Sequence, residues 1–185
     1  MPDYQMGEHV IWLTGATGHL GQSIAESLAR AGAHVVLSGR RPDEVAALGK
    51  RVNAFGGSVT VLPFDIENAE QRERAARSIV DDVGRLDGIV NNAYAGRPGT
   101  IESATVEDFE RACAFNLSAP FHLIQLVLPL LKEAGQRNVG GAAVVNIASM
   151  YGMVSPDPRI YGKSGSDNPP YYGATKAGLI QLTRY

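Results

Sequence analysis

The chain has 185 residues, enough for one domain of ordinary size, and its hydrophobic fraction of 44 % fits a globular core. The net charge is −2 and no basic patch stands out, which argues against nucleic-acid binding. The single cysteine, Cys113, excludes an intrachain disulfide and a zinc site made of cysteines. The most apolar stretch, residues 120–131, is short for a bilayer span and the N-terminus lacks a signal pattern, so we expect a soluble, cytoplasmic protein.

Short apolar runs alternate with amphipathic stretches along the chain. Strands are expected at residues 9–14, 33–38, 58–64, 86–91 and 142–148. Helices are expected at residues 19–31, 42–54, 68–83, 105–133 and 171–185. This alternation predicts an α/β fold with a doubly wound parallel sheet, the Rossmann fold, in which helices cover both faces of the strands. Its ligand should lie beyond the carboxyl ends of the strands.

A glycine-rich turn joins the first expected strand to the first expected helix. It reads Thr14-Gly15-Ala16-Thr17-Gly18-His19-Leu20-Gly21. Glycines let the chain turn tightly and let a diphosphate approach the backbone. The helix N-terminus then offers free N–H groups and the positive end of its dipole. The turn therefore predicts a dinucleotide-binding site.

The end of the second strand bears on which dinucleotide is bound. An acid at this place would bind the adenosine ribose and select NAD, but the position holds Gly39. Arg40 and Arg41 follow, and guanidinium groups suit a 2′-phosphate. We therefore predict NADP(H), with NAD as the alternative cofactor. The competing interpretation is that both arginines are solvated loop charges.

Tyr172 and Lys176 stand four residues apart in the last expected helix, so they share one face. A nearby cation favours the phenolate, and lowering the pKa of a phenol from about 10 to near 7 takes roughly 4 kcal/mol. Such a pair can transfer a proton at neutral pH. Taken alone, the spacing arises often by chance.

The motifs together resemble the short-chain dehydrogenase/reductase family over residues 9–185. The matching positions, in the family's order, are Thr14-Gly15 with Gly18 and Gly21, Asp65, Asn91-Asn92-Ala93, Asn116, and Ser149 with Tyr172 and Lys176. The resemblance implies an NAD(P)-dependent oxidoreductase that interconverts an alcohol and a carbonyl. Together with the glycine turn and the end of the second strand, it predicts cofactor-binding residues at Thr14, Gly15, Thr17, Gly18, His19, Leu20, Gly21, Arg40, Asp65, Ile66, Asn92, Ala93, Tyr172 and Lys176. It implies no catalytic metal.

The resemblance also assigns roles to a catalytic tetrad. Tyr172 would be the general acid in reduction and the base in oxidation, and Lys176 would lower its pKa and hold the nicotinamide ribose. Ser149 would hydrogen-bond the substrate oxygen and stabilise the charge that develops there. Asn116 would hold a water that links Lys176 to solvent. Outside the tetrad, Asp65 would touch the adenine, and Asn92 would help to hold the end of the fourth strand against the cofactor.

Several of these residues have a second interpretation. Asp65 could be a helix cap or turn acid, and His19 a solvated side chain at a helix start. Asn116 could make a polar contact inside its helix, and Ser155 competes with Ser149 as the serine of the site.

The sequence departs from the family pattern in four places. The glycine spacing is the one usual in the family's extended branch, whereas Asn91-Asn92-Ala93 and Asn116 match the shorter branch, which we favour. Tyr94 stands where glycine is usual and is expected to narrow the nicotinamide end of the cleft. The interval from Ser149 to Tyr172 is about ten residues longer than usual, in a Pro/Gly-rich stretch expected to shape the substrate entrance. We interpret residues 1–185 as a single domain, cut within the helix that carries Tyr172, which should leave an unpaired sheet edge.

The main hypothesis is therefore an NADP-dependent alcohol/carbonyl oxidoreductase with Tyr172 as acid/base. The polar loop at residues 154–170 hints at a hydroxylated small-molecule substrate such as a sugar. By resemblance we expect a homo-dimer or homo-tetramer. The alternatives are a non-catalytic dinucleotide-binding module and a sugar-nucleotide epimerase-like enzyme.

Overall fold

The computed structural model describes residues 5–185, which divide into two compact units. The first unit comprises the chain up to Ala93 together with His122–Val145. The second unit comprises Tyr94–Phe121 and Asn146–Tyr185. The interpretation of one domain therefore stays a prediction.

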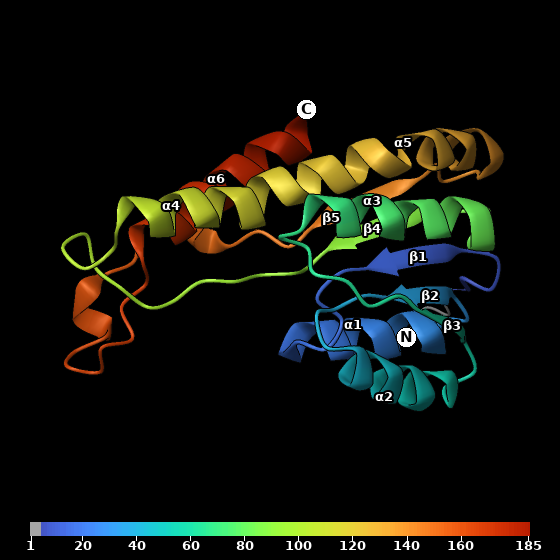
Figure 1. The fold of residues 1–185 in the computed structure, drawn as a ribbon, viewed down its shortest axis with the longest axis horizontal. Coiled ribbons are helices and arrows are strands. Elements are labelled where there is room, and N and C mark those ends of the chain that lie inside the picture. The colour runs from blue at the N-terminus through green and yellow to red at the C-terminus, as the bar shows by residue number, and fades with distance from the viewer. Residues whose placement is uncertain (1–4) are drawn as a thin grey trace. The chain divides into compact units, whose positions relative to one another are not determined.

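The first unit is built on a sheet with strand order β3-β2-β1-β4-β5 within the described residues (Figure 1). Its strands are β1 (Val10–Leu13), β2 (His34–Leu37), β3 (Ser58–Val61), β4 (Gly88–Asn91) and β5 (Ala143–Asn146). β1 pairs in parallel with β2 and with β4, and β2 pairs in parallel with β3. The order reverses direction beside β1, which is the switch point where ligands bind in open α/β sheets. The doubly wound fold expected from the sequence is confirmed.

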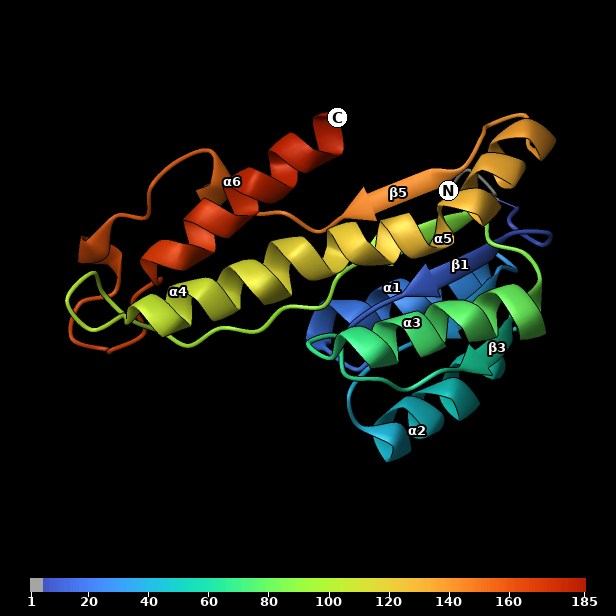
Figure 2. The same ribbon diagram turned by 45° about the horizontal axis from the view of Figure 1, so that its top comes forward.

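The helices lie close to their expected positions. They are α1 (His19–Arg30), α2 (Pro42–Asn53), α3 (Ala69–Ser78), α4 (Val106–Cys113), α5 (Ala119–Arg137) and α6 (Pro170–Arg184). In the first unit, α1 and α2 cover one face of the sheet, and α3 and the C-terminal part of α5 cover the other (Figures 1 and 2). Two π-helical turns were not expected: η1 (Ile79–Val83) continues α3, and η2 (Ala114–Ser118) joins α4 to α5.

The strands differ in how well they are covered. β1 and β4 are buried along their whole length, and β2 nearly so. In contrast, Ala143, Val144 and Val145 of β5 are exposed. The expectation that helices cover both faces of the strands is therefore wrong for β5. The reason is its place at the end of the sheet, where strands meet fewer neighbours.

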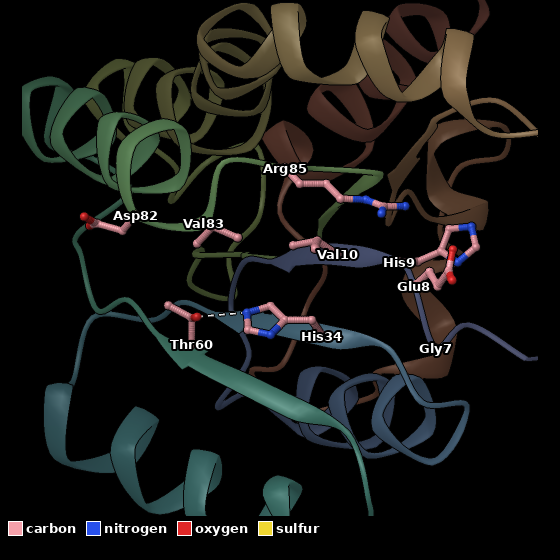
Figure 3. Close-up of a pocket in the computed structure, with 9 residues that line it drawn as sticks. All are labelled: Gly7, Glu8, His9, Val10, His34, Thr60, Asp82, Val83 and Arg85. Atoms are coloured by element: carbon pink, nitrogen blue, oxygen red, sulfur yellow. Dashed lines mark hydrogen bonds between the residues drawn. The ribbon is translucent and has the colours of Figure 1, made fainter.

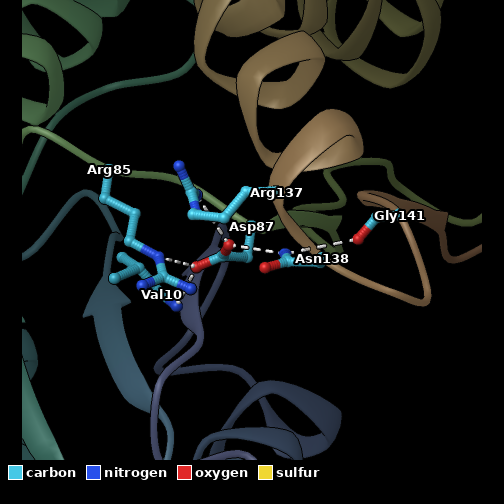
Figure 4. A network of polar contacts seen from close by, with 6 residues as sticks. All are labelled: Val10, Arg85, Asp87, Arg137, Asn138 and Gly141. Carbon is cyan, nitrogen blue, oxygen red and sulfur yellow. Dashed lines mark hydrogen bonds and ion pairs between the residues drawn. The ribbon is translucent and has the colours of Figure 1, made fainter.

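A buried carboxylate stabilises the end of the sheet where β1 and β4 begin (Figure 4). Asp87 accepts hydrogen bonds from Arg85 Nε (2.7 Å), the Val10 N–H (2.8 Å), Arg137 (3.0 Å) and Asn138 Nδ2 (2.8 Å). Burial alone would raise the pKa of Asp87, but these hydrogen bonds outweigh it and hold the pKa well below its ordinary value. The contacts tie the segment before β4 to β1 and to the end of α5.

The helix that runs from Val106 to Arg137 contains an 18-residue window of mean hydropathy 1.5. By length and composition it could cross a membrane, because α4, η2 and α5 continue well beyond the twelve-residue apolar stretch read from the sequence. Core helices of soluble proteins pass the same criterion, and 44 % of the window is buried. The finding is weak evidence for a membrane span.

Candidate active site

The glycine turn between β1 and α1 is required by its own packing. Gly15 has φ +62°, in the left-handed region, and a Cβ there would lie 2.7 Å from the Ala93 Cα. A Cβ at Gly21 would lie 2.2 Å from the Gly15 carbonyl oxygen and 2.8 Å from that of Ala16. Side chains at either position would collide with backbone atoms. These two glycines therefore bring the start of α1 close to the ends of β1 and β4.

Hydrogen bonds from the end of β4 hold this turn in place. Asn92 Nδ2 donates to the carbonyl oxygens of Thr14 (3.1 Å) and Gly15 (3.0 Å). The Thr14 hydroxyl accepts from the N–H groups of Asn92 (3.1 Å) and Ala93 (3.2 Å) and donates to the Val90 carbonyl (3.3 Å). Thr14 and Asn92 thus act as a clamp between β1 and β4, which fits the supporting role expected for Asn92.

Gly18 has no such structural requirement. Its φ is −69°, which any residue adopts, and the nearest atom to a Cβ would be the Gly15 carbonyl oxygen at 3.3 Å. Gly18 is also the N-cap of α1, so the N–H groups of His19, Leu20 and Gly21 open the helix. Bare backbone at a helix N-terminus is what the diphosphate of a dinucleotide needs. The turn therefore fits the cofactor predicted from the sequence.

At the end of β2, the position of Gly39 leaves little room for a side chain. A Cβ at Gly39 would lie 3.2 Å from Val45 Cγ2 and 3.4 Å from the Thr17 hydroxyl, so a side chain would be crowded. Of the two following arginines, Arg41 forms a surface ion pair with Glu44. Arg40 is exposed and forms no ion pair with another residue among residues 5–185.

Asp65 and Ile66 follow β3 as expected. Asp65 Oδ1 accepts the N–H of Glu67 (3.0 Å), and the Asp65 N–H donates to Gln71 Oε1 (2.8 Å). Ile66 is buried. The hydrogen bond from Glu67 to Oδ1 fits the alternative interpretation of Asp65 as a turn acid. The other carboxylate oxygen, Oδ2, takes no part in that turn.

In the second unit, α6 packs against the turn that carries Ser149. That turn is the short 3₁₀ helix η3 (Met150–Gly152), and the Ser149 hydroxyl accepts the Tyr151 N–H at 3.2 Å. A Cβ at Gly152 would lie 2.8 Å from backbone atoms of Lys176 and Ala177, and one at Gly173 would lie 2.7 Å from the Tyr151 carbonyl oxygen. Two glycines therefore bring η3 into direct contact with the helix of Tyr172.

The π-helical turn η2, which carries Asn116, also packs against α6. Leu117 Cδ2 would lie 3.0 Å from a Cβ at Gly178. Pro120 has no N–H to offer the carbonyl of Asn116 four residues earlier, which gives a physical reason for the irregular turn.

Asn116 Nδ2 donates to the Ala95 carbonyl at 3.4 Å, whereas its buried Oδ1 has no hydrogen-bond partner among residues 5–185. An orphaned buried oxygen of this kind suits a bound water. Sequence reasoning named Asn116 but did not use the signal of Pro120.

Lys176 lies one helical turn after Tyr172 on α6 and is 4 % exposed. Its ammonium donates to the carbonyl oxygen of Ile147, just after β5, at 2.5 Å. It also lies 5.9 Å from the centre of the Tyr172 ring. Burial lowers the pKa of Lys176 from its ordinary value. The structure therefore brings the phenol and the ammonium to one face of α6, as the spacing predicts.

The neighbouring Tyr171 has a different environment. Its hydroxyl donates to the Arg97 carbonyl (2.7 Å) and accepts the Arg97 N–H (3.1 Å), and its side chain is buried. Tyr171 therefore anchors the loop after β4 and has no lysine four residues later, which separates it from Tyr172.

The comparisons with known proteins agree with this geometry. The family described as short chain dehydrogenase matches residues 9–185. The chain belongs to the short-chain dehydrogenase family. Among its relatives in this family, the rhamnolipids biosynthesis 3-oxoacyl-[acyl-carrier-protein] reductase of Pseudomonas aeruginosa is 30 % identical over 183 residues, which cover 99 % of this chain and 67 % of the relative. The D-beta-hydroxybutyrate dehydrogenase of Rhizobium meliloti is 33 % identical over 174 residues, 93 % of this chain and 62 % of the relative.

Among solved structures, the Pseudomonas aeruginosa RhlG/NADP active-site complex matches with a TM-score of 0.86 and 29 % identity. The match covers all of this chain and 68 % of the other. The chain thus spans about two thirds of the length of these relatives.

A separate hollow of about 360 Å³ lies at the amino ends of β1 and β2 (Figure 3). His34 lies within it and its ring contacts the hydroxyls of Ser58 (2.6 Å) and Thr60 (2.9 Å). No cluster of three or more His, Cys, Asp or Glu side chains that could hold a metal occurs in residues 5–185. The hollow lies at the end of the sheet opposite the glycine turn.

Proposed function

We propose that this protein is an NADP-dependent oxidoreductase that interconverts an alcohol and a carbonyl. The observation that carries the proposal is the arrangement of Tyr172 and Lys176 on α6, with the ammonium buried and held by Ile147. Family membership supports it, as do the activities of two relatives, a 3-oxoacyl-[acyl-carrier-protein] reductase and a D-beta-hydroxybutyrate dehydrogenase. No observation favours the non-catalytic module or the epimerase-like alternative.

Each residue of the second unit has one task in this proposal. The bound dinucleotide supplies or accepts the hydride. The Tyr172 hydroxyl gives a proton to the substrate oxygen during reduction and takes it back during oxidation. The positive charge of Lys176 stabilises the phenolate in between. Ser149 donates its hydroxyl proton to the substrate oxygen, since its Oγ accepts from Tyr151 and leaves that proton available. Asn116 holds a water through its unpaired Oδ1.

In the first unit, the N–H groups at the start of α1 hold the diphosphate, and Arg40 holds the 2′-phosphate. The crowding of Gly39 by Val45 and Thr17 supports NADP over NAD, because an acid cannot be added there without displacing its neighbours. The NADP complex of the similar Pseudomonas aeruginosa structure also supports this choice. Asp65 and Ile66 would line the adenine.

The finer points of the assignment are also proposals. We propose a small-molecule substrate, and the polar loop at residues 154–170 supports a hydroxylated, sugar-like one. We also propose a homo-dimer or homo-tetramer, which the family resemblance supports, and a cytoplasmic location, which the absence of a signal pattern at the N-terminus supports.

The test replaces Tyr172 by Phe in the purified protein and measures NADPH oxidation with a panel of carbonyl substrates. Turnover should fall at least about a thousandfold, while NADPH binding changes little, because only the proton-transferring oxygen is lost. Tyr171→Phe is the matched control, because its phenol is engaged with the backbone of Arg97 and should affect stability instead. Retained turnover in the Tyr172 variant would reject the mechanism.

A further inference from the structure

Tyr94 lies against both members of the proton-transfer pair. Its ring packs edge-to-face on the ring of Tyr172, with ring centres 5.1 Å apart and planes at 83°. The Lys176 ammonium lies 5.6 Å from the centre of the Tyr94 ring, slightly closer than to the ring of Tyr172. One aromatic side chain from the loop after β4 thus touches the base and its cation at once.

These contacts matter because Lys176 is sparsely supported. An ammonium has three protons, and the hydrogen bond to the Ile147 carbonyl uses one. The faces of Tyr94 and Tyr172 both attract the cation, and such contacts are stronger when water is excluded. Removing the ring of Tyr94 would therefore leave Lys176 held by Ile147 and by the face of Tyr172.

Tyr94 is not a competing acid/base. Tyr94 is 44 % exposed, but its partial burial, then the interactions with Tyr172 and Tyr171, raises its pKa to about 12, so its phenol stays protonated at neutral pH. Tyr151 also packs edge-to-face on Tyr172, but at 6.5 Å. Its hydroxyl instead accepts a hydrogen bond from Tyr161 at 3.3 Å. Tyr94 is the closer of the two rings.

Gly96 allows the Tyr94 ring to occupy this place. A Cβ at position 96 would lie 2.1 Å from the Tyr94 hydroxyl oxygen and 2.8 Å from its Cζ. The backbone of Gly96 is not in the left-handed region, so alanine is acceptable there apart from this contact. Because the colliding atoms belong to the tip of a side chain, alanine at position 96 would displace Tyr94 and leave the main chain in place.

We propose that Tyr94 is a positioning residue for Tyr172 and Lys176, and that Gly96 is the residue that lets it lie there. The inference rests on the proposed function, in which Tyr172 and Lys176 transfer the proton. It assigns to Tyr94 a role beyond narrowing the cleft: the ring fixes the phenol and shields the ammonium.

The test is a double-mutant cycle with Tyr94→Ala, Gly96→Ala and the variant that carries both. The first measurement is the rate at which a trace amine-acetylating reagent labels Lys176, read by mass spectrometry against the exposed Lys50. Either single variant should expose the ammonium and raise its labelling several-fold. Gly96→Ala should add nothing in the Tyr94→Ala background, because no ring is left to displace.

The second measurement is kcat/KM for NADPH-dependent carbonyl reduction. Loss of one aromatic pair and one cation–π contact should lower it about tenfold in either single variant. Tyr94→Phe keeps the ring and should restore both the slow labelling and the rate. Gly99→Ala in the same loop is the control, since its Cβ would meet only the Ser103 hydroxyl at 3.2 Å.

The two measurements separate the two proposals. If Lys176 labelling responds as described but no carbonyl substrate is reduced by the parent protein, the function fails and the positioning role stands. If labelling is unchanged, or if the two substitutions add independently, the role of Tyr94 is refuted. A change in the urea midpoint alone, without a change in labelling or in kcat/KM, would also refute it.

Discussion

Gly21 and Gly18, two glycines of the turn after β1, should respond to alanine in different ways. In Gly21→Ala the new methyl group would lie 2.2 and 2.8 Å from two backbone oxygens of the turn, which cannot move away unless the main chain shifts. We expect a loss of about 3 kcal/mol in unfolding free energy, at the upper end of what overpacking costs. In Gly18→Ala the closest atom is at 3.3 Å, so the cost should stay below about 1 kcal/mol, mostly the weaker N-cap.

For the dissociation constant of NADPH, we expect Gly18→Ala to have a large effect although its effect on stability is small. The methyl group of Gly18→Ala would stand where a diphosphate approaches the N–H groups of α1. One lost hydrogen bond to a charged group is worth about 1.5–3 kcal/mol, which corresponds to a rise in Kd for NADPH of roughly ten- to a hundredfold. Gly18 should therefore be a binding position that the fold tolerates losing, and Gly21 a folding position.

Urea unfolding followed by the fluorescence of the single Trp12 measures the first quantity, because that side chain is fully buried in β1. Calorimetric titration with NADPH measures the second. Gly135→Ala, at a helical position with open space around it, controls for the general effect of the substitution. If Gly18→Ala unfolds as easily as Gly21→Ala, or binds NADPH as tightly as the parent, the assignment of Gly18 to the diphosphate is wrong.

Two further predictions concern the first unit. Asp87→Asn should lower the unfolding free energy by about 2–4 kcal/mol, because the two arginines that lose their charged partner are only partly exposed; Asp81→Asn, on the surface, is the control. Since folding lowers the pKa of Asp87, its contribution to the unfolding free energy is present above the unfolded pKa of about 3.9 and is lost as the pH falls below that value. The urea midpoint should therefore drop less steeply in acid for the Asn variant than for the parent protein. Arg40→Asp should weaken NADPH binding far more than NADH binding, and equal changes in the two dissociation constants would contradict the 2′-phosphate role.

Much of the site follows from local sequence patterns. The position of Tyr172 and Lys176 on one face depends only on helical spacing, and α6 reproduces it. The use of Gly15 at a positive φ follows from its place between a strand and a helix. The alternative interpretation of Asp65 as a turn acid was also readable from its neighbours, and the structure shows that contact. These features are decided within a few residues, which is why they can be read from the sequence.

Features that depend on partners distant in the chain were not readable. The sequence did not show that β5 is exposed, because a run of apolar residues looks the same at the end of a sheet as in its middle. It gave no sign that Gly152 and Gly173 bring η3 against α6, since the contact joins segments about twenty residues apart. The sequence analysis did not predict the π-helical turn at Asn116, because apolar periodicity does not distinguish i+4 from i+5 hydrogen bonding over one turn. Pro120 was the one local signal of an irregular turn.

By itself the sequence determined the order of strands and helices, the glycine turn and the family, because each rests on periodicity or on a fixed spacing of residue types. Tertiary structure alone decided what the two neighbouring phenols contact: the Tyr171 hydroxyl is engaged with the backbone of Arg97, whereas the Tyr172 ring packs against Tyr94. It also decided that packing requires glycine at position 21 but does not require it at position 18. The physical reason is that steric contact and burial depend on atoms that folding brings together from remote parts of the chain.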